Sequence, residues 1–201
     1  MRSRNAERPS AIPDTRDVMT LFVLRANAQQ YHDRRLRNCR SGTWMHSNMS
    51  PFEIPSFTYI SLDRRDSTFI ISLHRGQENR LNTTICNEII KAFHYIQRTL
   101  GPDAEGAVIT RGHNAKFWCT GVDQDERETN PYANSDGFFP MIRTILDFPY
   151  PTVALLTGHT FGGACPFALS HDYRVMNSER GFISMVHNPL HIPSDRLLTK
   201  M

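Results

Sequence analysis

A helical repeat of apolar residues is the clearest hydrophobic pattern in the chain, and it covers residues 83–100. Its apolar positions follow one another at spacings of four, four, three and four residues, at Ile85, Ile89, Phe93, Ile96 and Leu100. This spacing puts them on one face of a helix. Asn82 or Thr83 can cap the start, and Gly101-Pro102 ends the repeat. The pattern therefore predicts one long amphipathic helix.

Short runs rich in β-branched and aromatic residues surround this helix. Two of them, 57–62 and 68–73, flank the polar sequence Asp63-Arg64-Arg65-Asp66 and predict a β-hairpin. The other runs predict strands over 107–110, 152–157, 172–176 and 182–186, helices over 138–146 and 164–169, and loops over 111–123 and 129–137. The order β-β-α-β-α-β-α-β-β predicts an α/β fold, with helices packed on a sheet through right-handed crossovers.

The first 55 residues lack such patterns and mix Arg, Ser, Asn, Gln and Pro. Residues 1–50 contain nine arginines and four acidic residues, so they carry a net charge of +5. This composition predicts a basic, disordered N-terminal extension over 1–55, followed by the folded part over 56–201. An organelle transit peptide is the alternative for this basic extension.

The composition of the whole chain disfavours several kinds of function. The net charge of the chain is +3, which leaves −2 on the folded part, so a nucleic-acid-binding surface is not predicted. The four cysteines are scattered without a Cys-x-x-Cys pair, which argues against a zinc site or a disulfide framework and favours a reducing compartment. No apolar run approaches the ~20 residues of a membrane span, so a soluble protein is expected.

Two glycine-bearing loops each follow a predicted strand. The strand over 152–157 breaks at Gly158 and reaches the pair Gly162-Gly163, just before the helix over 164–169, and the other loop contains Thr120-Gly121. Glycine lets a second molecule approach the backbone, and the first amides of a helix lack internal acceptors. Two convergent amides of this kind stabilise negative charge on a thioester oxygen. An ordinary tight turn under a helix is the alternative.

The same loops carry a family resemblance. Residues 57–193 resemble the enoyl-CoA hydratase/isomerase (crotonase) family, because Trp118-Cys119-Thr120-Gly121-Val122-Asp123 is similar to its Phe-x-Ala-Gly-x-Asp loop. A second block is similar to the family signature Pro-x-x-Ala…Gly…Gly-Gly-Gly…Asp-x-Arg, with Pro151-Thr152-Val153-Ala154, Gly158, Phe161-Gly162-Gly163-Ala164-Cys165 and Asp172-Tyr173-Arg174-Val175. The resemblance implies a crotonase-like spiral of ββα units and acyl-CoA thioesters as substrates.

By this resemblance, the backbone amides of Thr120 and Gly163 form an oxyanion hole for the thioester carbonyl. The substrate-binding residues that the resemblance implies are Thr120, Gly121, Val122, Asp123, Gly162 and Gly163. It implies no metal and no cofactor other than the coenzyme A of the substrate.

The resemblance also bears on the reaction. Hydratases of the family use two glutamates, and the first of them falls at Pro166, which cannot activate water. Isomerases that move a 3-enoyl double bond to the 2-position use a single Glu, which carries a proton from C2 to C4. Leu190 and Pro193 set a register that puts His187 at this Glu, and a neutral imidazole can act as a base near pH 7. The resemblance favours a Δ3-Δ2-enoyl-CoA isomerase of fatty-acid beta-oxidation, with Asp195 as a second candidate base.

Two alternatives stay open at this point. One is a hydratase-type enzyme of a specialised acyl-CoA pathway, and the other is a non-catalytic, truncated crotonase-like protein that binds CoA thioesters. Family members continue well past the position of Pro193 into helices that complete the acyl pocket and build a trimer, whereas only residues 194–201 follow here. A C-terminally truncated crotonase fold is therefore expected, and assembly into a trimer is an open question.

Two polar clusters have ordinary structural explanations. Acidic side chains gather after the first glycine loop, at Asp123, Asp125, Glu126 and Glu128. Acids at a helix N-terminus are a more common reason for such a cluster than a metal site. Ser170-His171-Asp172 is not predicted to be a catalytic triad, because adjacent side chains in a strand point to opposite faces.

Four further side chains lie near the proposed site without a predicted chemical role. His113 and His159 are expected to be solvated residues on loops. Cys119 and Cys165 adjoin the predicted amide donors, and no nearby base is evident that would activate either thiol. Small packing residues are therefore expected at both cysteine positions.

The last three residues, Thr199-Lys200-Met201, are a weak match to the Ser-Lys-Leu peroxisomal address. Together with the acyl-CoA resemblance, they make the peroxisome the expected compartment, with the mitochondrion and the cytoplasm as alternatives.

Overall fold

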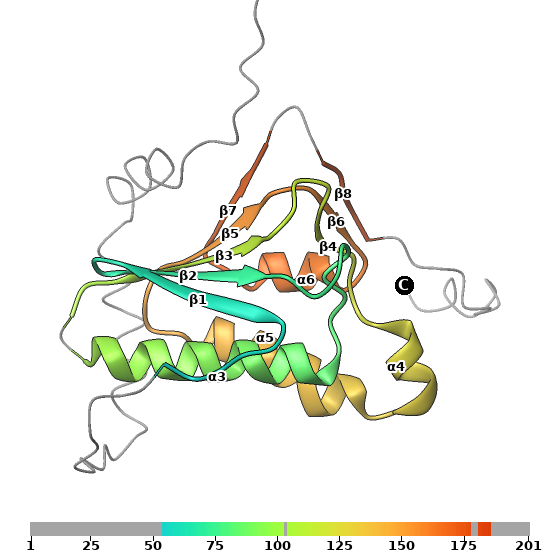
Figure 1. Cartoon of the computed structure of the whole chain (residues 1–201), viewed down its shortest axis with the longest axis horizontal. Coiled ribbons are helices and arrows are strands. Elements are labelled where there is room, and N and C mark those ends of the chain that lie inside the picture. The colour runs from blue at the N-terminus through green and yellow to red at the C-terminus, as the bar shows by residue number, and fades with distance from the viewer. Residues whose placement is uncertain (1–53, 103, 178–180, 186–201) are drawn as a thin grey trace, which may run out of the picture.

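The computed structural model describes residues 54–102, 104–177 and 181–185, which form two β-sheets with helices packed on the larger one (Figure 1). The larger sheet contains, in spatial order, β1 (Ile60–Arg65), β2 (Thr68–Leu73), β3 (Ala107–Gly112), β5 (Thr152–Leu156) and β7 (Tyr173–Met176). β1 runs antiparallel to β2, and the other neighbours are parallel. The predicted α/β class is confirmed.

The smaller sheet is parallel and consists of β4 (Phe117–Cys119), β6 (His159–Phe161) and β8 (Ile183–Ser184). The expected loops around β4 and β6 are corrected here, because strands this short carry too little alternation to be recognised in a sequence. Gly158 allows β6 to begin beside β4, since a β-carbon at this position would lie 2.4 Å from the carbonyl oxygen of Lys116.

Some of the helices could be predicted from the sequence pattern, and others could not. They are α3 (Thr83–Leu100), α4 (Gln124–Thr129), the π-helical turn η1 (Asn134–Phe138), α5 (Phe139–Leu146) and α6 (Ala164–Leu169). In Figure 1, α3 and α5 run along one face of the larger sheet. The loop predicted over 129–137 is wrong in part, because η1 precedes α5. α4 has no buried residue and so offers no apolar face to detect. None of the helices in the described ranges is long and apolar enough to cross a membrane.

α3 begins and ends where the sequence predicts. The side-chain oxygen of Asn82 accepts a hydrogen bond from the Ile85 amide at 3.0 Å, so Asn82 is the N-cap. Gly101 has a φ of 71°, which favours glycine, and its N–H donates to the carbonyl oxygen of Gln97 at 3.0 Å. Both helix signals are therefore confirmed.

The hairpin is confirmed, but its first strand lies further along the chain than predicted. β1 extends through the charged residues to Arg65, which pairs with Thr68. The turn falls at Asp66, whose φ is 52°. Charged residues fit here because β1 is an edge strand and its side chains from Asp63 to Arg65 are exposed.

The main core lies between the larger sheet and its helices. Its members include Phe69, Ile71, Leu73, Ile85, Ile89, Phe93, Ile96, Val108, Ile145 and Leu156. Trp118 of β4 stacks on Phe167 of α6 with ring centroids 4.9 Å apart. This stack fixes the smaller sheet against α6, so the loops that follow β4 and β6 are held on a packed base.

Candidate functional site

The two glycine loops meet. A β-carbon on Gly121 would lie 2.7 Å from the amide nitrogen of Gly163 and 2.8 Å from the carbonyl oxygen of Phe161. A β-carbon on Gly163 would lie 2.7 Å from Val122 Cγ2 and 3.2 Å from the Val122 nitrogen. A side chain at either position would have to displace a neighbour: backbone atoms at Gly121 and mainly the Val122 side chain at Gly163.

The smaller sheet brings the loops together. β4 and β6 are parallel neighbours, with Phe117 opposite His159 and Cys119 opposite Thr160. The carboxyl ends of parallel neighbours lie at the same edge of a sheet. The loop 120–123 leaves β4 at this edge, and Gly162-Gly163 leaves β6 there.

Thr120 does not point its amide into this contact. Its N–H donates to the carbonyl oxygen of Glu78 at 3.0 Å. The predicted oxyanion donor at Thr120 is therefore corrected, because this N–H already has a backbone acceptor.

The Val122 amide lies on the other side of the loop. Leu81 donates its N–H to the Gly121 carbonyl at 2.8 Å, and its carbonyl accepts from the Asp123 N–H at 2.8 Å. In a parallel bridge of this kind, the residue between the two bonded peptides points its own N–H away from the partner strand. The Val122 N–H therefore points away from Leu81, on the side where Gly163 lies.

The amides of Val122 and Gly163 share two properties that matter for binding. Within the described part of the chain, neither N–H forms a hydrogen bond with a backbone carbonyl. Val122, Gly162 and Gly163 are half-buried, so the contact is accessible from the surface. The sequence could not identify Val122 as a donor, because the direction of its N–H depends on the pairing with Leu81.

Gly162 connects the contact to β8. Gly162 has a φ of 55°, and its N–H donates to the carbonyl oxygen of Ser184 at 2.9 Å. Gly162 therefore shapes the entry to α6 and ties it to the strand that precedes residues 186–201. Those residues include the predicted bases His187 and Asp195 and the C-terminal Thr199-Lys200-Met201, which all lie outside the described residues.

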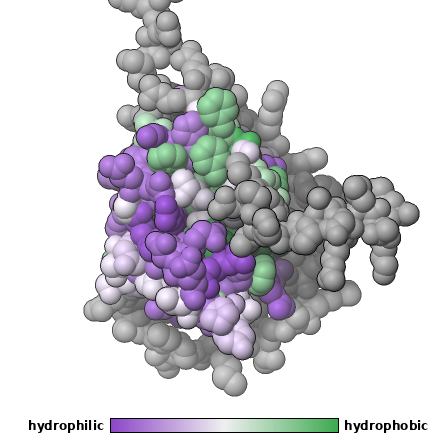
Figure 2. Space-filling model, turned by 90° about the vertical axis from the view of Figure 1, so that its right-hand side faces the viewer, coloured by the Kyte–Doolittle hydropathy of each residue, from purple (hydrophilic) through white to green (hydrophobic). Residues whose placement is uncertain are grey.

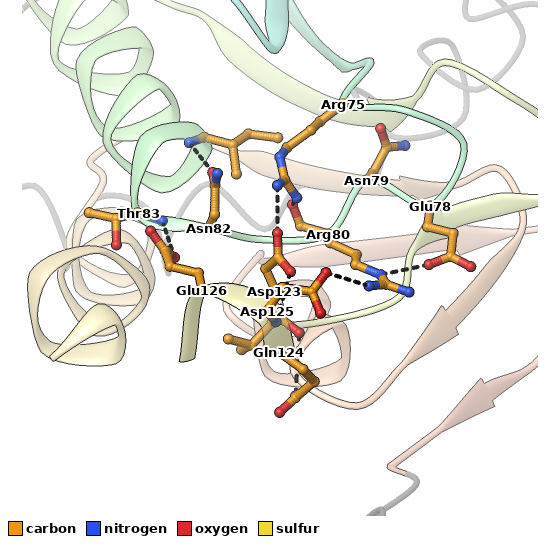
Figure 3. Close-up of polar contacts among 12 residues, drawn as sticks. Arg75, Glu78, Asn79, Arg80, Asn82, Thr83, Asp123, Gln124, Asp125 and Glu126 are labelled. Atoms are coloured by element: carbon orange, nitrogen blue, oxygen red, sulfur yellow. Dashed lines mark hydrogen bonds and ion pairs between the residues drawn. The ribbon is translucent and has the colours of Figure 1, made fainter. Parts of the chain in front are cut away.

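Asp123 fixes the end of the loop 120–123. It is the N-cap of α4, and its Oδ1 accepts from the Asp125 N–H at 3.3 Å, while Arg75 Nη2 donates to its Oδ2. Figure 3 shows these contacts together with those of Arg80. The acidic cluster is thus a helix N-terminus, as predicted, and the described residues contain no group of three or more potential metal ligands.

Pro166 is the third residue of α6, and its carbonyl accepts from the Ser170 N–H at 2.9 Å. The side chain of Pro166 offers no group that titrates or donates. The position predicted to lack the hydratase glutamate is therefore part of a short helix that begins at the glycine contact.

Ser170, His171 and Asp172 do not form a catalytic triad, as predicted. The His171 ring is 3% exposed and bridges the carbonyl oxygen of Phe167, 2.9 Å away, and Thr110 Oγ1, 3.0 Å away. Burial lowers the pKa of His171 to about 4. Ser170 Oγ also bonds the Phe167 carbonyl, at 2.7 Å, while Oδ2 of Asp172 accepts from Thr152 Oγ1 at 2.8 Å, so the three side chains bond structural partners and not one another.

The cysteines beside the contact are packing residues, as predicted. Cys119 is fully buried, and its thiol donates to the carbonyl oxygen of Asn79 at 3.1 Å. Burial raises the pKa of Cys119 to about 12 and also raises the pKa of Cys165. Burial thus favours the thiol form of both groups, which fits the packing role.

The prediction for His159 needs correction, because its ring lies in an aromatic stack. The ring centroid is 5.4 Å from that of Phe182, with an interplanar angle of 6°, and 5.4 Å from that of Phe161. His159 Nδ1 accepts from the Phe182 N–H at 3.2 Å. His113 is exposed, as predicted.

Figure 2 shows the side of the molecule that carries α4 and β8, where a small hydrophobic area adjoins a larger hydrophilic surface.

The sequence and the fold of this chain were compared with those of known proteins. Residues 63–186 match the family model described as Enoyl-CoA hydratase/isomerase. Enoyl-CoA delta isomerase 1, peroxisomal, from Arabidopsis thaliana is 31% identical over 128 residues, which are 62% of this chain and 52% of that protein. Enoyl-CoA delta isomerase 3 from the same organism is 28% identical over 141 residues, covering 66% of this chain and 58% of that protein.

A more distant relative is the mitochondrial Delta(3,5)-Delta(2,4)-dienoyl-CoA isomerase of Dictyostelium discoideum. It is 27% identical over 160 residues, which are 70% of this chain and 54% of that protein. The chain thus spans about half the length of the curated relatives it matches.

Solved structures share the fold. The enoyl-CoA hydratase structure from Geobacillus kaustophilus has a TM-score of 0.57 and 26% identity, covering 64% of this chain and 49% of that chain. The enoyl-CoA hydratase from Bacillus anthracis has a TM-score of 0.52 and 26% identity, covering 59% of this chain and 47% of that chain. The predicted crotonase-like fold is confirmed.

Proposed function

The chain belongs to the enoyl-CoA hydratase/isomerase family, and on this premise we propose that it moves the double bond of a 3-enoyl-CoA to the 2-position in fatty-acid beta-oxidation. One observation carries the proposal. The backbones of Gly121 and Gly163 are in contact, and within the described residues neither the Val122 nor the Gly163 N–H forms a backbone hydrogen bond.

The chemistry needs two such donors. Removal of a proton from C2 of a 3-enoyl thioester gives a dienolate, and its negative charge develops on the thioester oxygen. Preorganised N–H groups stabilise that charge, and loss of one donor typically costs about 3–4 kcal/mol of transition-state stabilisation. We assign the two donors to Val122 and Gly163, with Gly121, Asp123 and Gly162 holding the loops in place.

A base must carry the proton between two carbon atoms. In the proposal, His187 takes the proton from C2 and returns it at C4, while the double bond moves from C3–C4 to C2–C3. No other atom enters or leaves. The support for His187 comes from its register in the sequence and from Ser184, only three residues earlier, whose carbonyl accepts from the Gly162 N–H.

Isomerisation is favoured over hydration by Pro166. Adding water to a 2-enoyl-CoA requires a group that activates the water molecule, and Pro166 has none at the position where the resemblance puts the first hydratase glutamate. The names of the Arabidopsis relatives, which are delta isomerases, support the same choice.

The proposal is tested by giving the purified 201-residue protein a 3-enoyl-CoA and following the absorbance of the conjugated 2-enoyl product. We expect turnover that His187→Ala abolishes and His187→Glu retains. Unchanged turnover in His187→Ala would refute the base. Binding of the thioester without turnover would instead indicate a non-catalytic thioester-binding protein, and accumulation of a 3-hydroxyacyl-CoA would indicate a hydratase. The mass of the protein in solution, measured in the same samples, tests whether it assembles as a trimer.

We propose the peroxisome as the compartment, with the mitochondrion as the alternative, because the relatives include a peroxisomal and a mitochondrial isomerase. Fluorescent fusions at the N-terminus and at the C-terminus distinguish the two. A C-terminal address is blocked by a C-terminal fusion, and an N-terminal transit peptide is blocked by an N-terminal one.

A further inference from the structure

The guanidinium group of Arg75 connects three segments next to the glycine contact. Its Nη1 donates to the carbonyl oxygen of Arg80 at 2.8 Å, and its Nη2 donates to Oδ2 of Asp123 at 2.5 Å. Its Cζ lies 5.5 Å from the centroid of the Tyr59 ring. Figure 3 shows Arg75 reaching from the segment after β2 to the Asp123 carboxylate. The fork of the guanidinium group can make both hydrogen bonds at once.

Asp123 depends on this partner. The side chains of Asp123 and Arg75 are 7% and 23% exposed, so the pair is shielded from water. Removing one member of a shielded pair is destabilising. Loss of Arg75 would leave the Asp123 carboxylate without this donor and would also remove the hydrogen bond to the Arg80 carbonyl, so the loop 120–123 and the segment that pairs with it would lose their shared tie.

The Val122 amide lies in that main chain. Asp123 is the next residue, and its own N–H makes one of the two bonds to Leu81 that turn the Val122 N–H away from β2 and α3. On the other side, Gly121 has a φ of 97° and provides no side chain to resist rotation of the peptide. The Gly121 carbonyl, which belongs to the same peptide as the Val122 N–H, nevertheless accepts from the Leu81 N–H, so the bridge to Leu81 holds this direction from both sides. Arg75 supports the bridge at Asp123 and at the carbonyl of Arg80, which belongs to the peptide that carries the Leu81 N–H.

We propose that Arg75 is a positioning residue, which aims the Val122 amide at the thioester oxygen by holding Asp123. This inference rests on the proposed function, because only a bound carbonyl gives the direction of this amide a consequence. Arg75 itself does not contact the substrate in this arrangement. Its loss therefore weakens stabilisation of the developing charge more than it weakens binding of the coenzyme A portion.

Arg80 provides a matched control in the same segment. It pairs with Glu78 at 2.7 Å and with Asp125 at 3.7 Å, and these three side chains are 41–88% exposed. Exposed ion pairs of this kind contribute little to stability. Arg80→Ala removes an arginine of the same segment and leaves the Arg75–Asp123 pair in place, because Arg75 bonds only the main-chain carbonyl of Arg80.

The test uses a readout that reports the amides directly. Cinnamoyl-CoA is a conjugated thioester with no C4 proton to transfer, and its absorption moves to longer wavelength when donors polarise the carbonyl group. We expect the wild-type protein and Arg80→Ala to give the same shift. Arg75→Gln should lose most of it, with a change of less than about threefold in the dissociation constant. In the isomerase assay, kcat of Arg75→Gln should fall about tenfold to hundredfold with little change in KM. This fall is smaller than the roughly 10²–10³ typical of a removed donor, because the Val122 N–H is misdirected and not absent.

Two more variants keep the inference falsifiable if Arg75→Gln folds poorly. Arg75→Lys keeps the charge but not the fork, so an intermediate spectral shift is expected. Arg75→Gln combined with Asp123→Asn removes the buried charge as well, so the double variant should fold while its spectral shift stays small. A full wild-type shift in a folded Arg75→Gln or double variant would overturn the positioning role. Absence of the shift in the wild-type protein would overturn the proposed oxyanion hole and, with it, the role of Arg75.

Discussion

Gly121 and Gly163 touch through their backbones, and a β-carbon on Gly121 would lie only 2.7 Å from the Gly163 nitrogen. Residues 121 and 163 are far apart in the sequence, and their contact is the point where the loop after β4 meets the loop after β6. A β-carbon on either residue would lie within 3 Å of a neighbouring atom, and this crowding yields the first prediction.

Gly121→Ala and Gly163→Ala should both lower the stability of the protein, but only the loss in Gly163→Ala should be relieved by a second substitution. At Gly121, the new methyl group meets backbone atoms, and the φ of 97° is itself unfavourable for alanine. We expect a loss of roughly 2–4 kcal/mol in the free energy of unfolding, from strain and overpacking together. Chemical denaturation measures this loss.

At Gly163, the nearest atom is Cγ2 of Val122, a side-chain atom that can be removed, and the φ of −60° suits alanine. Gly163→Ala should therefore cost about 1–3 kcal/mol alone and less in a Val122→Ala background. Equal losses in both backgrounds would show that the Val122 side chain is not the obstacle.

Stability should depend on pH through His171. Its pKa is lowered to about 4 in the folded chain by burial, against about 6.5 when unfolded. The unfolded state therefore binds the proton more tightly. The contribution of neutral His171 to the free energy of unfolding is fully present above pH 6.5. It is lost as the pH falls towards 4, by about 3 kcal/mol in total.

The control for this prediction is His171→Gln, which cannot titrate in the same range. Asp172 and Arg174 act on the His171 pKa in opposite directions and remain in both proteins. Denaturation midpoints should fall more steeply between pH 6.5 and 4 in the wild type than in the variant. Parallel curves for the two proteins would exclude His171 as the cause.

Glu88 should hold the segment before β1 on α3. Its Oε1 accepts from the Thr58 N–H at 2.7 Å and its Oε2 from the Tyr59 N–H at 2.8 Å. Glu88→Ala leaves both donors without this acceptor, and we expect a loss of about 1–3 kcal/mol. Hydrogen exchange at the two amides should become faster.

Glu88→Gln is the control, because its single carbonyl oxygen can still accept one of the two hydrogen bonds. Its loss of stability should lie between those of the wild type and Glu88→Ala. Unchanged exchange at the Thr58 and Tyr59 amides in Glu88→Ala would contradict the assignment.

The Asn82 N-cap of α3 should make a measurable contribution to the free energy of unfolding. Asn82→Ala removes the acceptor of the Ile85 N–H, while the Thr83 N–H keeps Oε2 of Glu126 at 2.8 Å. We therefore expect a loss of about 1 kcal/mol rather than unfolding of the first turn. Thr84→Ala, at an exposed position of the same turn, should change the free energy of unfolding by less than about 0.5 kcal/mol.

The sequence by itself determined the elements whose signals are local. The repeat in α3, its Asn82 cap and its Gly101 end involve residues within a few positions of one another, so nearest-neighbour geometry is enough to predict them. The two motif blocks likewise identified the glycine loops and the family. Asp123 at a helix start belongs to the same class of local signal.

Only the tertiary structure decided which amides are available. Thr120 and Val122 are two residues apart and chemically equivalent as donors. The Thr120 N–H nevertheless donates to the Glu78 carbonyl, whereas the bridge to Leu81 turns the Val122 N–H towards Gly163. The partner strand comes from some forty residues away in the sequence. The direction of a backbone N–H is set by such long-range pairing, and a local pattern of side chains does not encode it.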